Sequence, residues 1–407
     1  MDNPVLVIGF AVIAVIIVVI VVFAIRRHRY VQSLRDEGWE FDTSPTIDNI
    51  VGLNHAPFGT GFGREVDDMV YGTTPNGLEF KALEYDIDGW GSKHYVLMIR
   101  LPKSLPFLYV RPADRPSRIP GLPHGPVARL GTHEVLAATE DYAHHVGGVI
   151  VGMLGPLAGF EVSVDHANLV IHDIAEQVDD LRTAVHVGGE IAAAVAVAAE
   201  PYDAPPAPPH LSFTHRPHWR YVPRDDSFLN QVRYTRGGQN HEARDIVLGE
   251  AHGIAFIRLT HKWETESRDS DGDITTEEHT EELCEYRLLF PFRALNLGSS
   301  MFGFRNDRAG LQFESSQFNE AYKVTALSPR FAHDVLHPRM MEWLLQVGRP
   351  QFQIFDNGAV VLQPRRHWSL QDIEQGNALL YDFFARVPDF VYQNLGAWPR
   401  PVPEHEW

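Results

Sequence analysis

The sequence predicts an α+β protein in which an N-terminal transmembrane helix precedes two tandem, related units of antiparallel sheet plus helices. Two observations underlie this prediction: a charge-free apolar run opens the 407-residue chain, and segments of its first half recur in the same order in its second half. Within each half, strand-like runs come first and helical stretches come late. This order is typical of an antiparallel sheet with helices packed on one face.

Residues 5–25 form the apolar run and contain no charged side chain. As a helix rising about 1.5 Å per residue, the run would extend roughly 31 Å, which matches the hydrocarbon thickness of a bilayer. No basic side chain precedes it and no small-residue cleavage site follows it, so the pattern favours an uncleaved anchor over a secretory signal peptide.

Basic residues follow the run, with a tyrosine beside them: Arg26, Arg27, Arg29 and Tyr30. Lys and Arg flanking a span remain on the cytoplasmic side. We therefore expect a single-pass protein of the cell membrane with its N-terminus outside and the bulk of the chain in the cytoplasm. These four residues are expected to flank the membrane and to contact its lipid headgroups. Residues 1–30 are taken as the anchor and its basic flank.

Matching segments recur about 180–190 residues apart, which indicates a tandem duplication. The matched segments are GWEF (38–41) with HWRY (218–221), DDMVYG (67–72) with RDIVLG (244–249), HYVLMIRL (94–101) with EYRLLFPF (285–292), and GFEVSVDHANLVIH (159–172) with QFQIFDNGAVVLQP (351–364). A Pro/Ala segment at 200–212 lies between the halves and suits a stiff linker. The predicted units are residues 31–199 and 213–407.

Each unit opens with short runs of alternating, β-branched or aromatic residues, which predict strands. Pro75-Asn76-Gly77 and Asp356-Asn357-Gly358 predict hairpin turns. Two helical stretches are expected late in each unit, and the final one in the second unit begins at Ser369, a typical N-cap.

Composition excludes some functions. The formal net charge is −18, so the chain is not expected to bind nucleic acid, whose phosphates an acidic surface repels. The one cysteine, Cys284, precludes an internal disulfide. Because acidic residues surround Cys284, its thiol is not expected to act as a nucleophile. No cofactor is expected.

His333-Asp334-x-x-His337 differs by one carboxylate type from the H-E-x-x-H signature of zinc proteases. That signature needs both histidines on one face of a continuous helix. Pro338 disfavours a helical conformation at His337, so we expect one helix over residues 329–336 and a second from Pro338. A packing helix pair is therefore preferred, and a metal site at His333 and His337 is the alternative.

Polar residues crowd the segment FESSQFNEAYKVTA (313–326), just before a predicted strand. Glu314, Ser315, Asn319 and Tyr322 either line a ligand pocket or cap a turn. They are the candidate ligand-binding residues. The acidic run from Asp269 to Glu278 has Asp271-Gly272 at its centre and is interpreted as an exposed hairpin tip, with calcium binding as the alternative.

The segment FESSQFNEAYKVTALSPRFAHDVLHPRMMEWLL (313–345), followed by FQIFDNGAVVLQ (352–363), resembles a family of uncharacterised bacterial single-span membrane proteins. Members share an E-S-x-x-F-N segment followed by P-R-x-M-E. The first half of this chain has no counterpart to either motif. The resemblance implies a membrane location and no particular activity.

These observations favour a non-catalytic protein that binds or scaffolds at the inner membrane face. Its partner is expected to be another protein, a lipid headgroup or a small ligand. Two alternatives stay open: a membrane-tethered metal-dependent hydrolase that uses His333, Asp334, His337 or Glu342, and a structural protein associated with the envelope.

Overall fold

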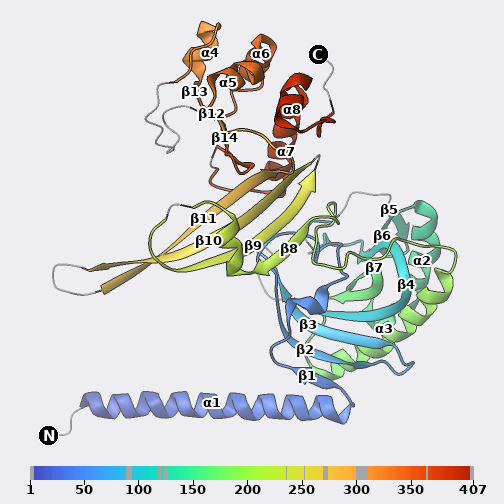
Figure 1. The fold of residues 1–407 in the computed structure, drawn as a ribbon. Helices are drawn as coiled ribbons and strands as arrows, with labels where there is room; N and C mark the ends of the chain where they lie inside the picture. The colour runs from blue at the N-terminus through green and yellow to red at the C-terminus, as the bar shows by residue number, and fades with distance from the viewer. Residues whose placement is uncertain are drawn as a thin grey trace. The chain divides into compact units, whose positions relative to one another are not determined.

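The computed structural model describes residues 4–403, apart from 89–93, 118, 120, 123–126, 235, 252, 269–273, 299–309 and 364, and it describes side chains from Ile16 onward. The chain divides into two compact units, Met1–Pro217 and His218–Trp407. Each unit holds an antiparallel sheet with helices (Figure 1). The predicted α+β class is therefore confirmed.

The first unit opens with one long helix and then builds a seven-stranded sheet. Its elements are α1 (Pro4–Asp36), β1 (Glu40–Asp42), η1 (Ile47–Ile50), β2 (Glu65–Thr73), β3 (Glu79–Asp86), β4 (His94–Pro112), β5 (Val127–Leu130), β6 (His133–Ala137), α2 (Glu140–Met153), η2 (Gly155–Leu157), β7 (Glu161–His172) and α3 (Val178–Ala198). The strand order is β1-β2-β3-β4-β6-β5, and β7 pairs with the other edge of β4.

Helices α2 and α3 cover one face of this sheet and bury its core. Among the helices whose side chains are described throughout, α3 is long and apolar enough to cross a membrane. Its residues Leu181, Val185, Ile191 and Val195 are fully buried in the core of the first unit. Helix α3 is therefore a core helix of this unit. The predicted span at residues 5–25 lies within α1, and side chains are described only for its part from Ile16 onward.

The Pro/Ala segment after α3 packs on the first unit. The Arg64 guanidinium donates to the Ser212 carbonyl at 2.8 Å, and the Thr214 hydroxyl donates to the Asn54 carbonyl at 2.8 Å. Leu211 and Phe213 are buried. The segment predicted as a linker is thus fastened to the first unit, which extends to Pro217.

The second unit builds an eight-stranded sheet with its helices late in the chain. Its elements are β8 (Arg220–Arg224), η3 (Asp226–Gln231), β9 (Gln239–Ala251), β10 (Ile254–Arg268), β11 (Ile274–Leu288), β12 (Leu295–Gly298), α4 (Ser316–Ala321), β13 (Lys323–Ala326), α5 (Pro329–Val335), α6 (Pro338–Gln346), β14 (Phe352–Ile354), β15 (Ala359–Leu362), α7 (Leu370–Ala385) and α8 (Asp389–Leu395). The strand order is β13-β12-β14-β15-β11-β10-β9-β8.

Both sheets carry the same irregularity in their second strand. In β2 the pairing with β3 slips between Asp67 and Met69, and Asp68 has a positive φ of 34°. In β9 the pairing with β10 slips at the matched place, where Asp245 has a φ of 50°. Each slip is a β-bulge whose extra aspartate tolerates the left-handed region.

A strand glycine under an aromatic pair also recurs in both sheets. The contacts are Gly72 with Trp39 and Phe80 in the first unit, and Gly249 with Trp219 and Phe256 in the second. The two aromatic pairs are edge-to-face, with ring centroids 5.3 and 4.6 Å apart. A Cβ on either glycine would overlap the rings, so only glycine lets tryptophan and phenylalanine meet over the strand.

One sequence match is out of register by four residues. Phe80 pairs with Ile99, and Phe256, the counterpart of Phe80, pairs with Tyr286. Ile99 therefore corresponds to Tyr286, whereas matching 94–101 with 285–292 places it at Phe290. Both strands are apolar on alternate residues, so an even-numbered slip keeps the same face buried and leaves no trace in the sequence.

We expect Gly72→Ala to destabilise the first unit by about 1–3 kcal/mol, because a Cβ there would lie 2.9 Å from Trp39 and 3.2 Å from Phe80. Hydrogen exchange in peptides from β2 and β3 measures the change. The control is Gly148→Ala on α2, where a Cβ meets open space; it should stabilise by up to about 1 kcal/mol. Equal effects of the two substitutions would contradict this packing.

Candidate functional site

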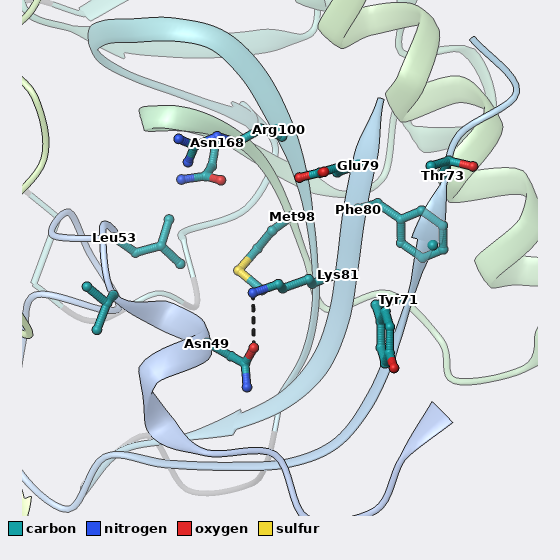
Figure 2. Close-up of a pocket in the computed structure, with 12 residues that line it drawn as sticks. Asn49, Leu53, Tyr71, Thr73, Glu79, Phe80, Lys81, Met98, Arg100 and Asn168 are labelled. Atoms are coloured by element: carbon teal, nitrogen blue, oxygen red, sulfur yellow. Dashed lines mark hydrogen bonds between the residues drawn. The ribbon is translucent and has the colours of Figure 1, made fainter. Parts of the chain in front are cut away.

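A cavity of about 510 Å³ lies on the face of the first sheet that α2 and α3 leave uncovered. Strand residues alternate between faces: Ala82 and Leu97 point into the helix-covered core, whereas Lys81 and Met98 line the cavity. The η1 turn and the loop after it supply the opposite wall (Figure 2). Its volume falls in the range of small-molecule sites.

The lining combines cations and amides with an apolar floor. The lining residues are Asn49, Val51, Leu53, Tyr71, Gly72, Thr73, Glu79, Phe80, Lys81, Met98, Arg100 and Asn168. Lys81 donates from Nζ to Asn49 Oδ1 at 3.0 Å, which ties β3 to the η1 turn (Figure 2). Two cations, Lys81 and Arg100, stand against one carboxylate, Glu79, so the lining has a net positive charge.

A buried carboxylate holds the loop that walls this cavity. The backbone N–H groups of Asn54 and His55 donate to the Asp165 carboxylate at 3.0 and 2.9 Å. Asp165 is 1% exposed. Burial raises the pKa of Asp165 to about 6, although His166 and the two N–H donors act in the opposite direction. The carboxylate therefore remains ionised at neutral pH.

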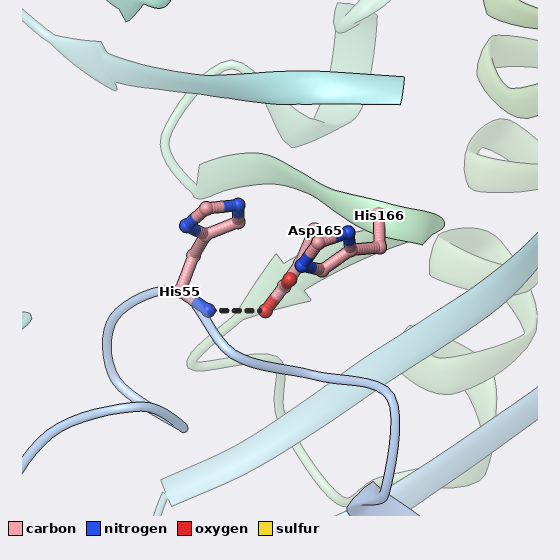
Figure 3. A group of neighbouring side chains, drawn as sticks. All are labelled: His55, Asp165 and His166. Atoms are coloured by element: carbon pink, nitrogen blue, oxygen red, sulfur yellow. Dashed lines mark hydrogen bonds between the residues drawn. The ribbon is translucent and has the colours of Figure 1, made fainter. Parts of the chain in front are cut away.

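Two histidines flank this carboxylate (Figure 3). The rings of His55 and His166 stack nearly parallel, with centroids 5.1 Å apart, and His55 also lies 4.7 Å from the Phe107 ring. Burial lowers the pKa of His55 to about 4, with a smaller contribution from His215. Burial also lowers the pKa of His166, against the opposing effect of Asp165. Both rings are neutral at pH 7.

Two of the four candidates in 313–326, Ser315 and Asn319, make hydrogen bonds to the local backbone. Ser315 caps α4, its hydroxyl accepting from the Phe318 N–H at 3.2 Å. Asn319 bridges the backbone N–H and carbonyl of Phe313, at 2.9 and 2.7 Å. Tyr322 is buried, and Glu314 is exposed. None of the four lines the cavity, and the capping contacts are those of Ser315 and Asn319.

The histidines of H-D-x-x-H do not converge. The helix breaks as expected, with α5 ending at Val335 and His337 capping α6. His337 Nδ1 accepts from the Met340 N–H at 3.4 Å, and Nε2 lies 3.3 Å from the Arg386 carbonyl. Both ring nitrogens are therefore engaged, which leaves no lone pair for a metal. His333 is exposed and packs on Phe313.

Two residues of the basic flank contact the folded unit. Arg27 forms a bidentate ion pair with Asp68, at 2.8 and 3.3 Å, and its guanidinium lies 5.3 Å from the Phe41 ring centroid. The Tyr30 ring meets Phe41 edge-to-face at 5.8 Å. Arg26 and Arg29 are exposed.

Two further sequence features are the acidic hairpin and the single cysteine. Strands β10 and β11 pair along their whole length as the predicted hairpin, but residues 269–273 of its acidic tip lie outside the described residues. Cys284 is buried, and burial raises the pKa of its thiol to about 12. At neutral pH the thiol stays protonated, as expected for an unreactive cysteine.

Sequence reasoning missed the cavity and the His55–Asp165–His166 group. His55 lies 110 residues before Asp165 in the chain, and no spacing rule links it to the adjacent Asp165-His166 pair. The sequence match aligns this pair with Asn357-Gly358, whereas strand pairing aligns it with Asp356-Asn357.

No protein family and no curated protein matches this chain. Among solved structures, the chain is similar to the mycobacterial trehalose monomycolate transport factor A, with 12% identity and a TM-score of 0.33. That match covers 44% of this chain and 97% of the other. A likeness at this level carries no argument, so the function is argued from this chain's own residues.

Asn319→Ala should cost about 1–2 kcal/mol, because it removes two hydrogen bonds to Phe313. Glu314→Ala, a matched control in the same loop, should stay within about 0.5 kcal/mol of the parent. Amide exchange at Phe313 and α4 measures both. Comparable losses from both substitutions would show that this segment does more than cap a turn.

Proposed function

We propose that this chain is a membrane-anchored, cytoplasm-facing binding protein, and that its first unit takes a small anionic ligand in the cavity described above. The observation that carries the proposal is the direct packing of the end of α1 on the unit that holds the cavity. Residues 1–30 act as the anchor in this proposal, with the N-terminus outside.

The exposed surface of α1 supports the anchor. From Ile16 to Ile25 its apolar side chains are exposed on every side of the helix, with Val18, Val19 and Ile20 each about 60% exposed. A contiguous apolar surface of this kind is rare in water and typical of contact with lipid. The basic flank after it supports the cytoplasmic orientation of the folded units.

Direct packing of α1 places the first unit at the membrane surface in this proposal. Helix α1 continues without a break from the apolar run to Asp36, and Leu34 is fully buried in the core of the unit. Arg27, two residues beyond the run, pairs with Asp68. No flexible tether therefore separates the proposed span from the fold.

The lining defines the ligand class. Lys81 and Arg100 attract a phosphate or carboxylate, the amides of Asn49 and Asn168 supply hydrogen bonds, and Met98 offers an apolar floor. Among the described residues that line the cavity there is no histidine, serine, cysteine or aspartate, and the lysine, arginine and amides suit binding of an anion. We infer a small anionic molecule with an apolar portion.

The residues at the equivalent positions of the second unit differ from those that line the cavity, and this difference supports the assignment. We infer from the shared bulge, glycine contact and strand pairing that the two units arose by duplication. The cross-strand pair Tyr71–Lys81 then corresponds to Leu248–Ile257. Leu248 and Ile257 pack on an apolar cluster that includes Leu229 of η3. At these positions the second unit has leucine and isoleucine where the first has tyrosine and lysine, whereas Glu285 takes the place of Met98.

The orientation can be tested by thiol labelling in intact cells. Ser44→Cys and Glu320→Cys place exposed cysteines in the first and second units. Both should react with a membrane-impermeant reagent only after lysis. The native Cys284 is buried and is the internal background control. Labelling of either site in intact cells would place that unit outside and overturn the orientation.

The ligand can be tested by purifying the full chain from its membrane and identifying bound small molecules by mass spectrometry. We expect an anionic molecule to co-purify and to be reduced at least about tenfold in Lys81→Met/Arg100→Met, because two charge-assisted contacts are lost. Lys103→Met is the matched control, since Lys103 pairs with Asp203 and does not line the cavity. An identical set of bound molecules in all three proteins would refute the site.

A further inference from the structure

We infer that His55, Asp165 and His166 form a binding site for a divalent transition metal, with zinc as the first candidate. The donor atoms of these three side chains lie within 4.8 Å of one another. The inference does not depend on the membrane orientation or on the anionic ligand proposed above. It adds a cofactor to a chain for which the sequence predicts none.

The donor set matches the chemistry of zinc. Two neutral imidazoles and one carboxylate are ligand types that zinc accepts, at about 2.0–2.2 Å. A tetrahedral ion with such bonds holds neighbouring donors roughly 3.3 Å apart, so the two stacked rings must rotate to direct their lone pairs at one ion. Three protein ligands leave a position for a further donor, as in zinc sites that exchange ligands.

Hydrogen bonds fix His166 in the tautomer that can bind a metal. His166 Nδ1 lies 3.3 Å from the Ser104 hydroxyl oxygen. That hydroxyl donates its proton to the Pro205 carbonyl at 2.8 Å, so its oxygen accepts from Nδ1. Nδ1 therefore carries the ring proton, and Nε2 is left with a free lone pair. An outer hydrogen bond that orients a ligating histidine is the usual arrangement in metal sites.

His55 offers a buried nitrogen without a partner. Among the described residues, no group hydrogen-bonds its Nδ1, which is shielded from solvent. An unpaired buried nitrogen of this kind normally costs about 1–3 kcal/mol. The ring of His55 also supplies one donor atom that lies within 4.8 Å of those of Asp165 and His166. Asp165 is held for the same task by the N–H donors of Asn54 and His55, which orient its carboxylate while leaving further lone pairs.

The backbone at His166 is strained, which indicates that its side chain is retained for a purpose. His166 has a φ of 51°, in the left-handed region. Glycine adopts this conformation without penalty, whereas histidine does not. Strained residues of this kind concentrate at functional sites.

The site adjoins the cavity. Leu53 and Asn168, both in the cavity lining, are each two residues from a member of the group. Asn168 Nδ2 also reaches the Asp165 carbonyl at 3.5 Å. A metal held by His55, Asp165 and His166 would thus stand at the margin of the cavity, where an anionic ligand could supply the remaining donor.

The test measures zinc bound to the full chain in detergent. The protein is stripped with a chelator, dialysed against buffered zinc and assayed for metal content. We expect about one zinc per chain and a zinc-dependent rise in the thermal midpoint. His55→Phe keeps the ring contact with Phe107, and His166→Asn keeps a residue that tolerates positive φ. Each should weaken binding at least about tenfold.

His333→Ala is the control, because His333 is an exposed histidine in the other unit. It should leave zinc binding unchanged. Circular dichroism and amide hydrogen exchange in β7 show whether the two variants keep their fold. Equal zinc content in the parent and in the double variant His55→Phe/His166→Asn would overturn the inference, as would an equal loss in His333→Ala. Cobalt substitution adds a second readout, since a His₂Asp site should show the visible bands of tetrahedral cobalt.

Discussion

The buried carboxylate of Asp165 is the constraint on which the site of the first unit depends. It reaches from β7 to the backbone of Asn54 and His55 and so fixes the loop that walls the cavity. A buried ion needs compensation, since transfer of a charge out of water costs several kcal/mol even after relaxation. Two backbone N–H groups compensate in part, and burial still raises the pKa of this group to about 6. The proposed metal would complete the compensation, because a cation beside the carboxylate stabilises its charged form.

The second unit shows what the fold requires when no such site is present. Its strands pair as in the first unit, and its bulge and strand glycine match. Strand pairing makes Val360 the counterpart of Leu169, which puts Asp356-Asn357 where the first unit has Asp165-His166. The Asn357 side chain caps its own turn by accepting from the Ala359 N–H at 3.2 Å. The second unit therefore has an acid at this place, and the first unit differs by its histidine, which adopts a positive φ. Local strain of this kind is expected where a side chain is kept for binding.

Much of the fold could be predicted because its signals are local. Pro338 breaks the helix at His337, Ser369 caps α7, and alternating runs mark the strands. The four-residue error in the match of 94–101 with 285–292 could not be detected in the sequence, because an even-numbered shift keeps the same side chains on the buried face. The site escaped prediction for a different reason: His55 and Asp165 meet only through the pairing of β7 with β4 and the return of the 51–59 loop. Conversely, the polar residues around Asn319 looked functional because capping and binding use the same side chains.

A comparison of the corresponding sheet faces in the two units also bears on where the proposed ligand binds. In the second unit Leu248 and Ile257 pack against the cluster that includes Leu229 of η3, and the buried charge on this face, Glu285, pairs with Arg233 and Arg287. In the first unit Tyr71 and Lys81 occupy these positions, and the turn above them leaves a cavity. Filling that space with apolar side chains would stabilise the unit by the ordinary hydrophobic contribution of about 25 cal/mol per Å² of buried area. On our proposal, the first unit, which packs on the anchor, forgoes this stabilisation because a ligand occupies the space.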